Sequence, residues 1–155
     1  MFFTFCFVFL SMNWNYISGF FDADGSVSIT KNRKNEQASI QLSFHNNELK
    51  ILEEIKHFIS ADLSVKGTVI RERARKESHS DAYELRYVYQ AGYKVAKHLQ
   101  SHHPKKAYRL QLANEIAALT PRNGKYSKLM LEKRNKCIED FFNATPRSST
   151  KKDKT

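Results

Sequence analysis

The stretch NWNYISGFFDADGSVSI, residues 13–29, changes its hydrophobic period half-way along. Up to about Asp24 its apolar residues recur at helical spacing, whereas residues 26–30 alternate as a half-buried strand does. Gly25 stands between them as a C′ residue, the usual glycine position at a helix end. The stretch therefore predicts a helix that passes directly into a strand. It also places two acids, Asp22 and Asp24, at a helix C-terminus, where the macrodipole disfavours negative charge.

The rest of the chain alternates between strand-like and helix-like patterns. Alternation predicts a second strand over residues 38–46 and a second hairpin over residues 65–76 and 81–90. Pro104 is expected to break the helical pattern near the C-terminal third. The predicted helices after the first cover residues 48–59, 92–102, 105–119 and 126–142. This α-β-β-α-β-β-α order predicts an α+β fold with one four-stranded antiparallel sheet and helices on one face.

Length and composition indicate a single basic domain. Of the 155 residues, 26 are Lys or Arg and 16 are Asp or Glu, giving a net charge of +10. A folded domain this basic usually binds a polyanion. We expect nucleic acid rather than an anionic membrane surface, because no basic amphipathic helix stands out. The domain is expected over residues 13–143, after an extension at 1–12 and before a tail at 144–155 with the composition of disorder.

Cysteine usage and the N-terminus point to an intracellular protein without a membrane span. Cys6 and Cys137 lie far apart and lack CxxC spacing, so they define neither a zinc site nor a disulfide framework. The apolar residues 1–10 fall far short of the ~20 residues of a membrane span and lack the basic start of a signal peptide. Frequent Asn and Lys indicate an AT-rich genome, which makes a chloroplast or a mitochondrion a candidate location.

The polar sides of the two predicted hairpins carry side chains that can read base edges. Arginine suits guanine, Gln and Asn suit adenine, and a two-stranded ribbon fits the major groove. The first hairpin offers Ser28, Thr30, Asn32, Lys34, Ser39, Gln41, Ser43 and His45, and the second offers Arg71, Arg73, Arg75, Glu84 and Arg86. Any half-buried sheet has a polar solvent face. The row of arginines in a domain of charge +10 favours contact with double-stranded DNA.

The two acids at the helix end are explained if a second copy of the chain packs against the first. Asp22 and Asp24 are two residues apart, so on a helix they point in different directions and cannot form one tight pair. Gly19 and Ala23 lie on a stripe of small residues that also involves Ser18, and such a stripe lets two helices approach closely. If this helix packs on its own copy, two Asp24 carboxylates meet. They would repel each other unless divalent cations lay between them.

The nine residues ISGFFDADG, residues 17–25, resemble the motif that names the LAGLIDADG homing endonucleases. The departures, at Ile17, Ser18 and the Phe20–Phe21 pair, are conservative in apolarity or size. The order of helices and hairpins matches that family over roughly residues 13–142. A single copy of the motif resembles the homodimeric branch, whose motif helices form the dimer interface on a pseudo-palindromic DNA site. The resemblance implies cleavage of both DNA strands with Mg²⁺, or another divalent cation such as Mn²⁺, leaving short 3′ overhangs.

The resemblance also implies roles for residues of the motif helix. Asp24 matches the acid that binds the metal. Gly19 and Ala23 match the closely packed interface between the two motif helices, and Ser18 belongs to the same expected interface. Asp22 matches an acid near the helix end whose role is structural and which is expected at this interface as well.

Two further catalytic positions follow from the same resemblance. Family members carry a basic residue at the start of the helix after the fourth strand, and Lys94 in the sequence KVA fits that setting. It is expected to stabilise phosphate charge or to organise solvent. A polar residue after the second strand helps to position water, and Asn47 is assigned to it, with Asn46 and Glu48 as alternatives.

The expected function is intron homing by metal-dependent hydrolysis of a phosphodiester in each DNA strand. A metal-bound water would attack in line, with cations stabilising the phosphorane. The alternative is a maturase that assists intron splicing, or another DNA- or RNA-binding protein of this fold that does not cleave. The acidic residue Asp24 and the basic residue Lys94 favour cleavage, because a pure binding protein need not keep them.

Overall fold

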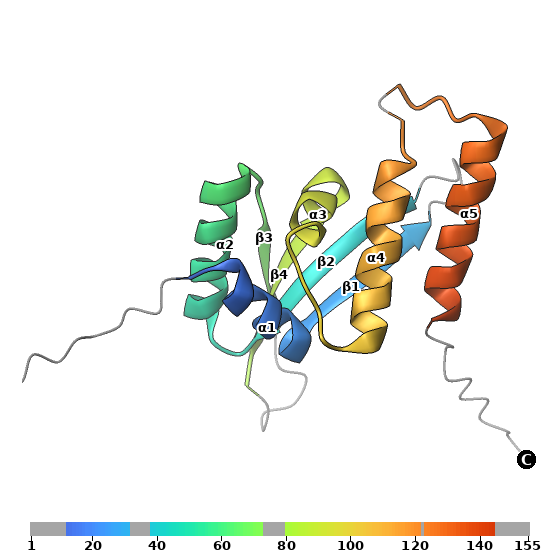
Figure 1. Ribbon diagram of the computed structural model, residues 1–155. Coiled ribbons are helices and arrows are strands. Elements are labelled where there is room, and N and C mark those ends of the chain that lie inside the picture. The colour runs from blue at the N-terminus through green and yellow to red at the C-terminus, as the bar shows by residue number, and fades with distance from the viewer. Residues whose placement is uncertain (1–11, 32–37, 73–79, 122, 145–155) are drawn as a thin grey trace, which may run out of the picture.

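The computed structural model describes residues 12–31, 38–72, 80–121 and 123–144 (Figure 1). In chain order the elements are α1 (Trp14–Asp24), β1 (Gly25–Lys31), β2 (Ala38–Asn46), α2 (Leu49–Leu63), β3 (Thr68–Glu72), β4 (Ala82–Val88), α3 (Tyr89–Ala96), α4 (Pro104–Ala118) and α5 (Lys128–Asn143). The predicted order of helices and strands is confirmed. Asn13 caps α1, because its side chain accepts a hydrogen bond from the backbone N–H of Tyr16.

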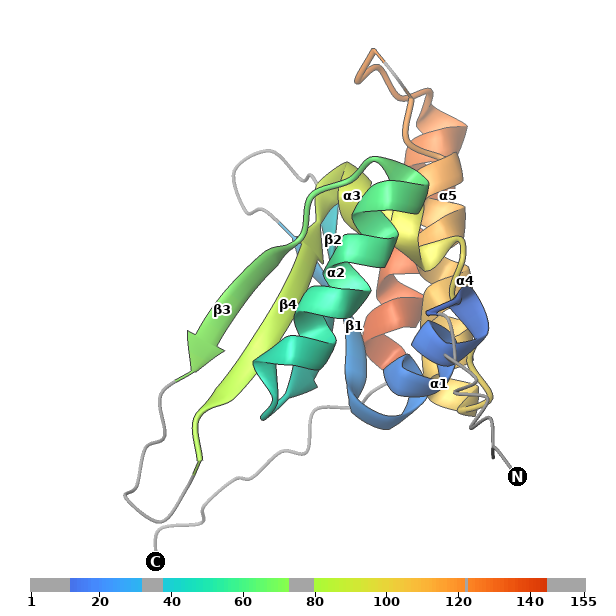
Figure 2. The ribbon, with the colours of Figure 1, turned by 90° about the vertical axis from the view of Figure 1, so that its left-hand side faces the viewer.

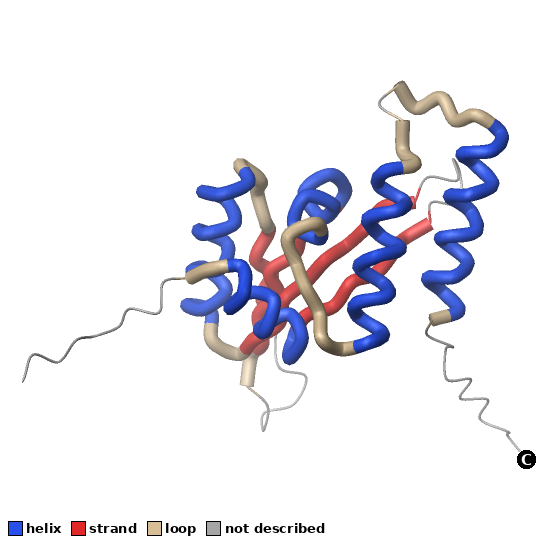
Figure 3. The backbone as a smooth tube through the Cα atoms, in the orientation of Figure 1, coloured by secondary structure: helices blue, strands red, loops and turns tan. Residues whose placement is uncertain are grey.

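The four strands form one antiparallel sheet in the order β1-β2-β4-β3. In Figure 3 the strands run side by side behind the helices. Seen from the side in Figure 2, the helices gather on one face of the sheet, and no described helix covers the opposite face. We call that opposite face the open face. The predicted fold class is confirmed.

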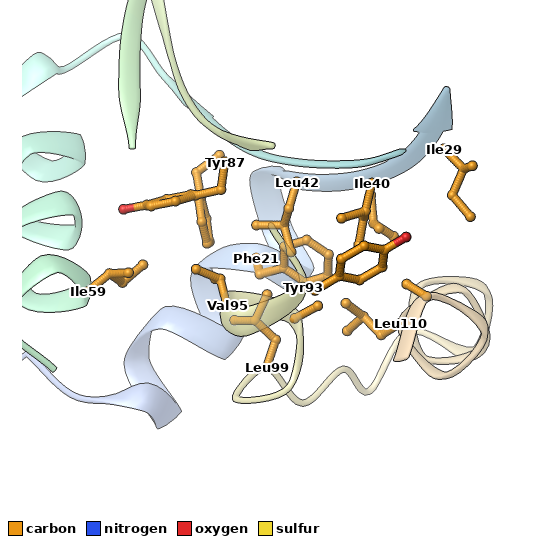
Figure 4. Packing of buried hydrophobic residues seen from close by; sticks show 14 of the residues in the cluster. Phe21, Ile29, Ile40, Leu42, Ile59, Tyr87, Tyr93, Val95, Leu99 and Leu110 are labelled. Atoms are coloured by element: carbon orange, nitrogen blue, oxygen red, sulfur yellow. The ribbon is translucent and has the colours of Figure 1, made fainter. Parts of the chain in front are cut away.

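Hydrophobic side chains fill the space between the sheet and the helices (Figure 4). Phe21 of α1 packs its ring edge-on against Phe44 of β2, with 6.0 Å between the ring centroids. Phe44 in turn packs edge-on against Tyr87 of β4 at 6.5 Å. Ile17 and Phe21 are fully buried, so one side of α1 is anchored to the sheet and the other side is left for different contacts.

Gly25 ends α1 in a different way from the predicted one. A C′ glycine usually has a positive φ, whereas Gly25 has φ −93° and ψ 159°, which is extended backbone. The glycine is needed for close approach instead, because a Cβ there would lie 2.2 Å from the Phe21 ring and 2.7 Å from the Phe21 carbonyl oxygen. The helix therefore turns straight into β1 without a left-handed residue.

Other boundaries also differ from the prediction. The helix predicted over residues 92–102 lies over Tyr89–Ala96, and the chain that follows runs as a loop along α1. Pro104 does not merely break a helix. It starts α4 at the first position, where a missing N–H and a fixed φ are favourable. Met12, assigned to an N-terminal extension, packs against the hydrophobic core, whereas residues 1–11 and 145–155 lie outside the described residues.

Candidate active site and nucleic-acid interface

The loop between α3 and α4 binds one side of α1. The backbone N–H of Gln100 donates to Ser18 Oγ at 3.0 Å. The Asp22 carboxylate accepts from the Ser101 hydroxyl, and from the backbone N–H of His102 at 2.8 Å. Ser18 and Asp22, four residues apart on the helix, therefore bind a loop of their own chain. Their place in a dimer interface stays a prediction.

The hydrogen bonds to Asp22 determine its titration. Partial burial raises the pKa of this carboxyl, but the hydrogen bonds from Ser101 and His102, and the charges of His102 and Lys106, outweigh it. The net result is a pKa below the ordinary value of an aspartate. The carboxylate thus stays ionised at neutral pH and holds the loop in place.

Asp22→Asn is expected to lower the free energy of unfolding by about 1 kcal/mol at pH 7, because an amide offers one acceptor where the carboxylate uses both oxygens. Since the folded-state pKa of Asp22 is lowered, its contribution is complete above the unfolded value of about 3.9 and is lost as pH falls through the folded value. The gap between wild type and variant should therefore close in acid, as measured by urea unfolding at pH 7 and near pH 3. Asp24→Asn is the matched control, and a gap independent of pH would contradict this role.

Lys106 brings a positive charge to the C-terminal end of α1. Its Nζ donates to the Phe21 carbonyl at 3.0 Å and to the Asp22 carbonyl at 2.7 Å, and lies 5.5 Å from the centroid of the Phe21 ring. These carbonyls belong to the last turn of the helix and carry the negative end of its dipole. Asp24, the last residue of α1, is exposed at the same end. A carboxylate, helix carbonyls and an ammonium group therefore gather where the motif helix meets β1.

Sequence reasoning missed Lys106, although a local signal existed. Lys105 and Lys106 lie in the first turn of α4, where the helix dipole disfavours cations, just as it disfavours acids at the end of α1. Lysines at the start of one helix and acids at the end of another can offset each other if the two helix ends meet. The structure brings them together across 85 residues of chain, from Phe21 to Lys106.

Lys94 is not where the sequence placed it. It lies exposed in the last turn of α3 and not at the start of a helix, and its carbonyl accepts from His98 Nδ1 at 2.9 Å. The strand before α3 ends with Val88 opposite Gln41, whereas Gly25, next to Asp24, pairs with Phe44. No described contact joins Lys94 to Asp24, so Lys106 is the lysine that the structure brings to the motif.

In the turn after β2, the three polar residues that were alternatives for positioning water have different environments. The side chain of Asn46 accepts from the backbone N–H of Glu48 at 2.8 Å, which commits Asn46 to the turn before α2. Asn47 is exposed between them. Because β1 begins opposite Phe44, this turn lies at the same end of the sheet as Asp24. Asn47 remains the predicted residue for positioning water.

Strand register decides which side chains share the open face. Residues directly opposite each other in antiparallel strands lie on one face. The predicted members found on the open face are Ser28, Thr30, Ser39, Gln41, Ser43, His45, Glu84 and Arg86. Ser43 and Glu84, however, are each only 3% exposed, so they are not the solvent-facing contacts that were predicted. Asn32, Lys34, Arg73 and Arg75 lie outside the described residues.

Arg71 lies on the other face of the sheet. It pairs with Tyr83, and the neighbouring pair on that side is Val69 with Leu85, which faces the core. Its Nε donates to Asp81 Oδ2 at 2.9 Å, and its Nη2 contacts the same oxygen. The prediction that Arg71 lines one face with Glu84 and Arg86 is wrong, because a shift of register by one residue moves every side chain to the opposite face.

The side of α1 turned away from the loop is open. Gly19 and Ala23 are exposed there beside Tyr16, which is 43% exposed. A methyl group at Gly19 would meet no atom of the described residues within 4 Å. Among the described residues, no group of three or more His, Cys, Asp and Glu side chains gathers as a metal site. One copy of the chain thus presents Asp24 as a single acid beside an unfilled helix face.

The motif helix and the four-stranded antiparallel sheet match the fold of solved homing endonucleases. The chain belongs to the LAGLIDADG endonuclease family, which residues 17–101 match. No curated protein matches the sequence closely. In the part of the chain that the structure describes, no helix is long and apolar enough to cross a membrane.

Solved structures of similar fold come from homing endonucleases bound to DNA. The archaeal intron-encoded homing endonuclease I-Vdi141I, complexed with DNA, is 21% identical with a TM-score of 0.61, over 90% of this chain and 88% of that one. The LAGLIDADG meganuclease I-AabMI, bound to uncleaved DNA, is 18% identical with a TM-score of 0.57, over 82% of this chain and 44% of that one. I-GzeII, in complex with its DNA target, is 15% identical with a TM-score of 0.55, over 86% and 44%. At these identities the likeness shows the fold.

Proposed function

We propose that this protein is a site-specific endonuclease that cuts both strands of DNA as a homodimer with a divalent cation. The observation that carries the proposal is the end of α1, where the exposed Asp24 lies beside helix carbonyls bound by Lys106. Membership of the LAGLIDADG endonuclease family and a fold shared with DNA-bound homing endonucleases support it.

The proposal of a homodimer rests on the uncovered small-residue face of α1 and on the single Asp24 of each chain. Gly19 and Ala23 leave a small-residue face on α1 onto which a second α1 can pack closely. Packing across a two-fold axis would bring two Asp24 carboxylates together. The chain spans 88% of the first DNA-bound relative but only 44% of the other two, which leaves room in those two for a second unit of this size. A two-fold dimer would bind a pseudo-palindromic site.

The donor atoms at the end of α1 suit Mg²⁺ or Mn²⁺. Magnesium prefers oxygen ligands and is commonly held by one or two carboxylates together with substrate phosphates. Two Asp24 side chains, one from each copy, provide such carboxylates, and the target DNA provides the phosphates. When bound, the cation stabilises the charge that develops on the phosphate and lowers the pKa of water.

The chain's own residues position the DNA and balance charge around the reacting phosphate. The ammonium group of Lys106 places a cation at the end of α1, where an additional negative charge develops during phosphodiester hydrolysis. Asn47 is exposed at the same end of the sheet, which supports the proposal that it orients water. Exposed and half-buried residues of the open face, among them Gln41 and Arg86, would contact base edges in the major groove.

Lys106→Met and Lys94→Met form a matched pair that tests this site. Sites are first selected with wild-type protein from a pool of randomised double-stranded DNA, and one of them is placed in a plasmid. We expect the wild type to linearise that plasmid with Mg²⁺, and we expect cleavage to stop when EDTA removes the metal. Lys106→Met should slow cleavage by about 10²–10³-fold, as removal of one charge-stabilising group does elsewhere, whereas Lys94→Met should leave the rate unchanged.

The other results identify which part of the proposal fails. Slow cleavage by Lys94→Met with normal cleavage by Lys106→Met would assign the catalytic lysine to α3. Sequence-specific binding by the wild type without cleavage in Mg²⁺ or Mn²⁺ would favour the alternative function, a maturase or another binding protein of this fold. Melting temperatures of both variants, measured alongside, separate loss of catalysis from loss of folding.

A further inference from the structure

An acid is buried in the middle of the open face, where DNA would lie. Glu84 of β4 is only 3% exposed although no described helix covers that face (Figure 2). Arg86, two residues along the same strand, donates from Nε to Glu84 Oε1 at 3.1 Å and from Nη2 to Glu84 Oε2 at 2.6 Å. The two side chains therefore form a bidentate pair on the open face of the sheet.

The surrounding residues complete the binding of the carboxylate. Ser43 lies opposite Arg86, and its hydroxyl donates to Glu84, while the hydroxyls of Ser43 and Ser26 are 3.0 Å apart. His45 lies opposite Glu84 on the same face. Burial raises the pKa of Glu84, but the hydrogen bonds from Arg86 and Ser43 outweigh it, so the pKa lies below its ordinary value. The acid is thus ionised and satisfied before any ligand arrives.

The pair leaves one edge of the guanidinium available. Arginine has five N–H donors in a rigid plane. Glu84 occupies the edge formed by Nε and one N–H of Nη2. The terminal edge, formed by Nη1 and the second N–H of Nη2, is not used by Glu84, and the Arg86 side chain is 35% exposed. Two parallel donors at that spacing match O6 and N7 of guanine in the major groove.

We propose that Glu84 is a positioning residue that holds Arg86 so that its terminal edge reads one guanine in each half-site. The inference rests on the proposed function, because it requires DNA on the open face. A carboxylate on a surface that meets phosphates opposes binding through repulsion. Its benefit is that the arginine loses less side-chain freedom on binding, because its orientation is already set. Glu84 therefore increases discrimination between sequences and not general affinity.

The test compares sequence preferences of four proteins on the same probe, a pool of randomised double-stranded DNA, with EDTA present so that binding is measured without metal. They are the wild type, Arg86→Ala, Glu84→Gln and the control Glu72→Gln. Glu72 is an exposed acid on the same face that interacts with Arg86 only through its charge. The best selected duplex and its single-base variants are then titrated individually.

We expect the wild type to prefer guanine at one position of each half-site by about 5- to 150-fold, the range of a good bidentate contact. Arg86→Ala should remove that preference. Glu84→Gln should reduce it to below about threefold at the same position, while affinity for unrelated DNA stays the same or rises, because a repelling charge is gone. Glu72→Gln should shift general affinity in the same direction and keep the guanine preference. A fifth protein combines Arg86→Ala with Glu84→Gln, and its discrimination between bases should be no lower than that of Arg86→Ala alone.

Several results would overturn the inference. A change of preference by Glu84→Gln at a different base pair would mean that Glu84 itself contacts a base. An equal loss of affinity for all sequences, or no loss of preference, would make the pair structural only. Glu84→Asp, which keeps the charge but shortens the reach to Arg86, serves if Glu84→Gln unfolds, and it should weaken the same guanine preference. A wild type that selects no sequence would instead refute the proposed function.

Discussion

Asp24→Asn is expected to abolish DNA cleavage while leaving folding and DNA binding intact. Asparagine keeps the shape of the side chain but removes its charge, so it cannot hold the cation that the proposed reaction needs. Metal ions supply several kcal/mol of charge stabilisation, so the cleavage rate should fall by at least about 10³-fold. Binding should persist because, in the proposed function, the open face of the sheet and not the end of α1 would carry the base contacts.

The unliganded protein should lose no stability through this substitution. The Asp24 carboxylate is exposed at the negative end of α1, where the dipole opposes it by about 0.3–1 kcal/mol. Asp22→Asn is the matched control on the same helix end. It removes hydrogen bonds to Ser101 and His102 and should lower stability while the folded protein still cleaves.

Gel-shift affinity, plasmid linearisation with Mg²⁺ and melting temperature, measured on one preparation of each variant, separate these effects. Near-normal cleavage by Asp24→Asn would remove Asp24 from the metal site. Loss of both folding and binding would make Asp24 a structural residue.

Gly19→Leu is expected to convert the proposed homodimer into a monomer and, for that reason, to abolish the proposed cutting of both strands. Within the chain the new side chain has space, because a Cβ at Gly19 meets no described atom within 4 Å. The protomer should even gain helix stability, since Gly is about 0.8–1 kcal/mol less favourable than Ala in a helix and Leu is nearly as good as Ala. The leucine would instead push a second motif helix away and separate the two Asp24 carboxylates.

Gly19→Ala is the matched control, because it also favours the helix but adds only a methyl group, the size already present at Ala23. Sedimentation velocity at micromolar concentration should show a dimer for the wild type and for Gly19→Ala, and a monomer for Gly19→Leu. A wild type that is monomeric and still cleaves both strands would refute the interface. A dimeric Gly19→Leu would place the interface elsewhere.

The motif helix, the strand after it and the sheet could be derived from the sequence because their signals are local. Asn13 caps a helix whose apolar residues recur every three to four positions, and the period changes to two at Gly25. Two hairpins with one apolar side each then require an antiparallel sheet covered on one face. The helical repeat also put Gly19 and Ala23 on one stripe and Asp24 at the end of the helix, and the structure leaves all three exposed.

Which side of each element meets which neighbour was decided by contacts between distant parts of the chain. Ser18 and Asp22 bind a loop 79 to 82 residues further on. The sequence pattern had predicted a helix over the residues of this loop, so these contacts could not be foreseen. Lys106 reaches α1 from the first turn of α4, although Lys94 matched the expected sequence setting better.

The sequence by itself determined the order of elements, the identity of the motif and the acid at its end. The tertiary structure alone decided that Arg71 and Arg86 lie on opposite faces of the sheet, and that Glu84 is buried and paired with Arg86 instead of facing solvent. The physical reason is the range of the forces involved. Hydrophobic periodicity and helix capping depend on residues a few positions apart. The face on which a strand residue lies depends instead on how β3 aligns with β4, and the contacts of α1 depend on where the loop after α3 packs against it.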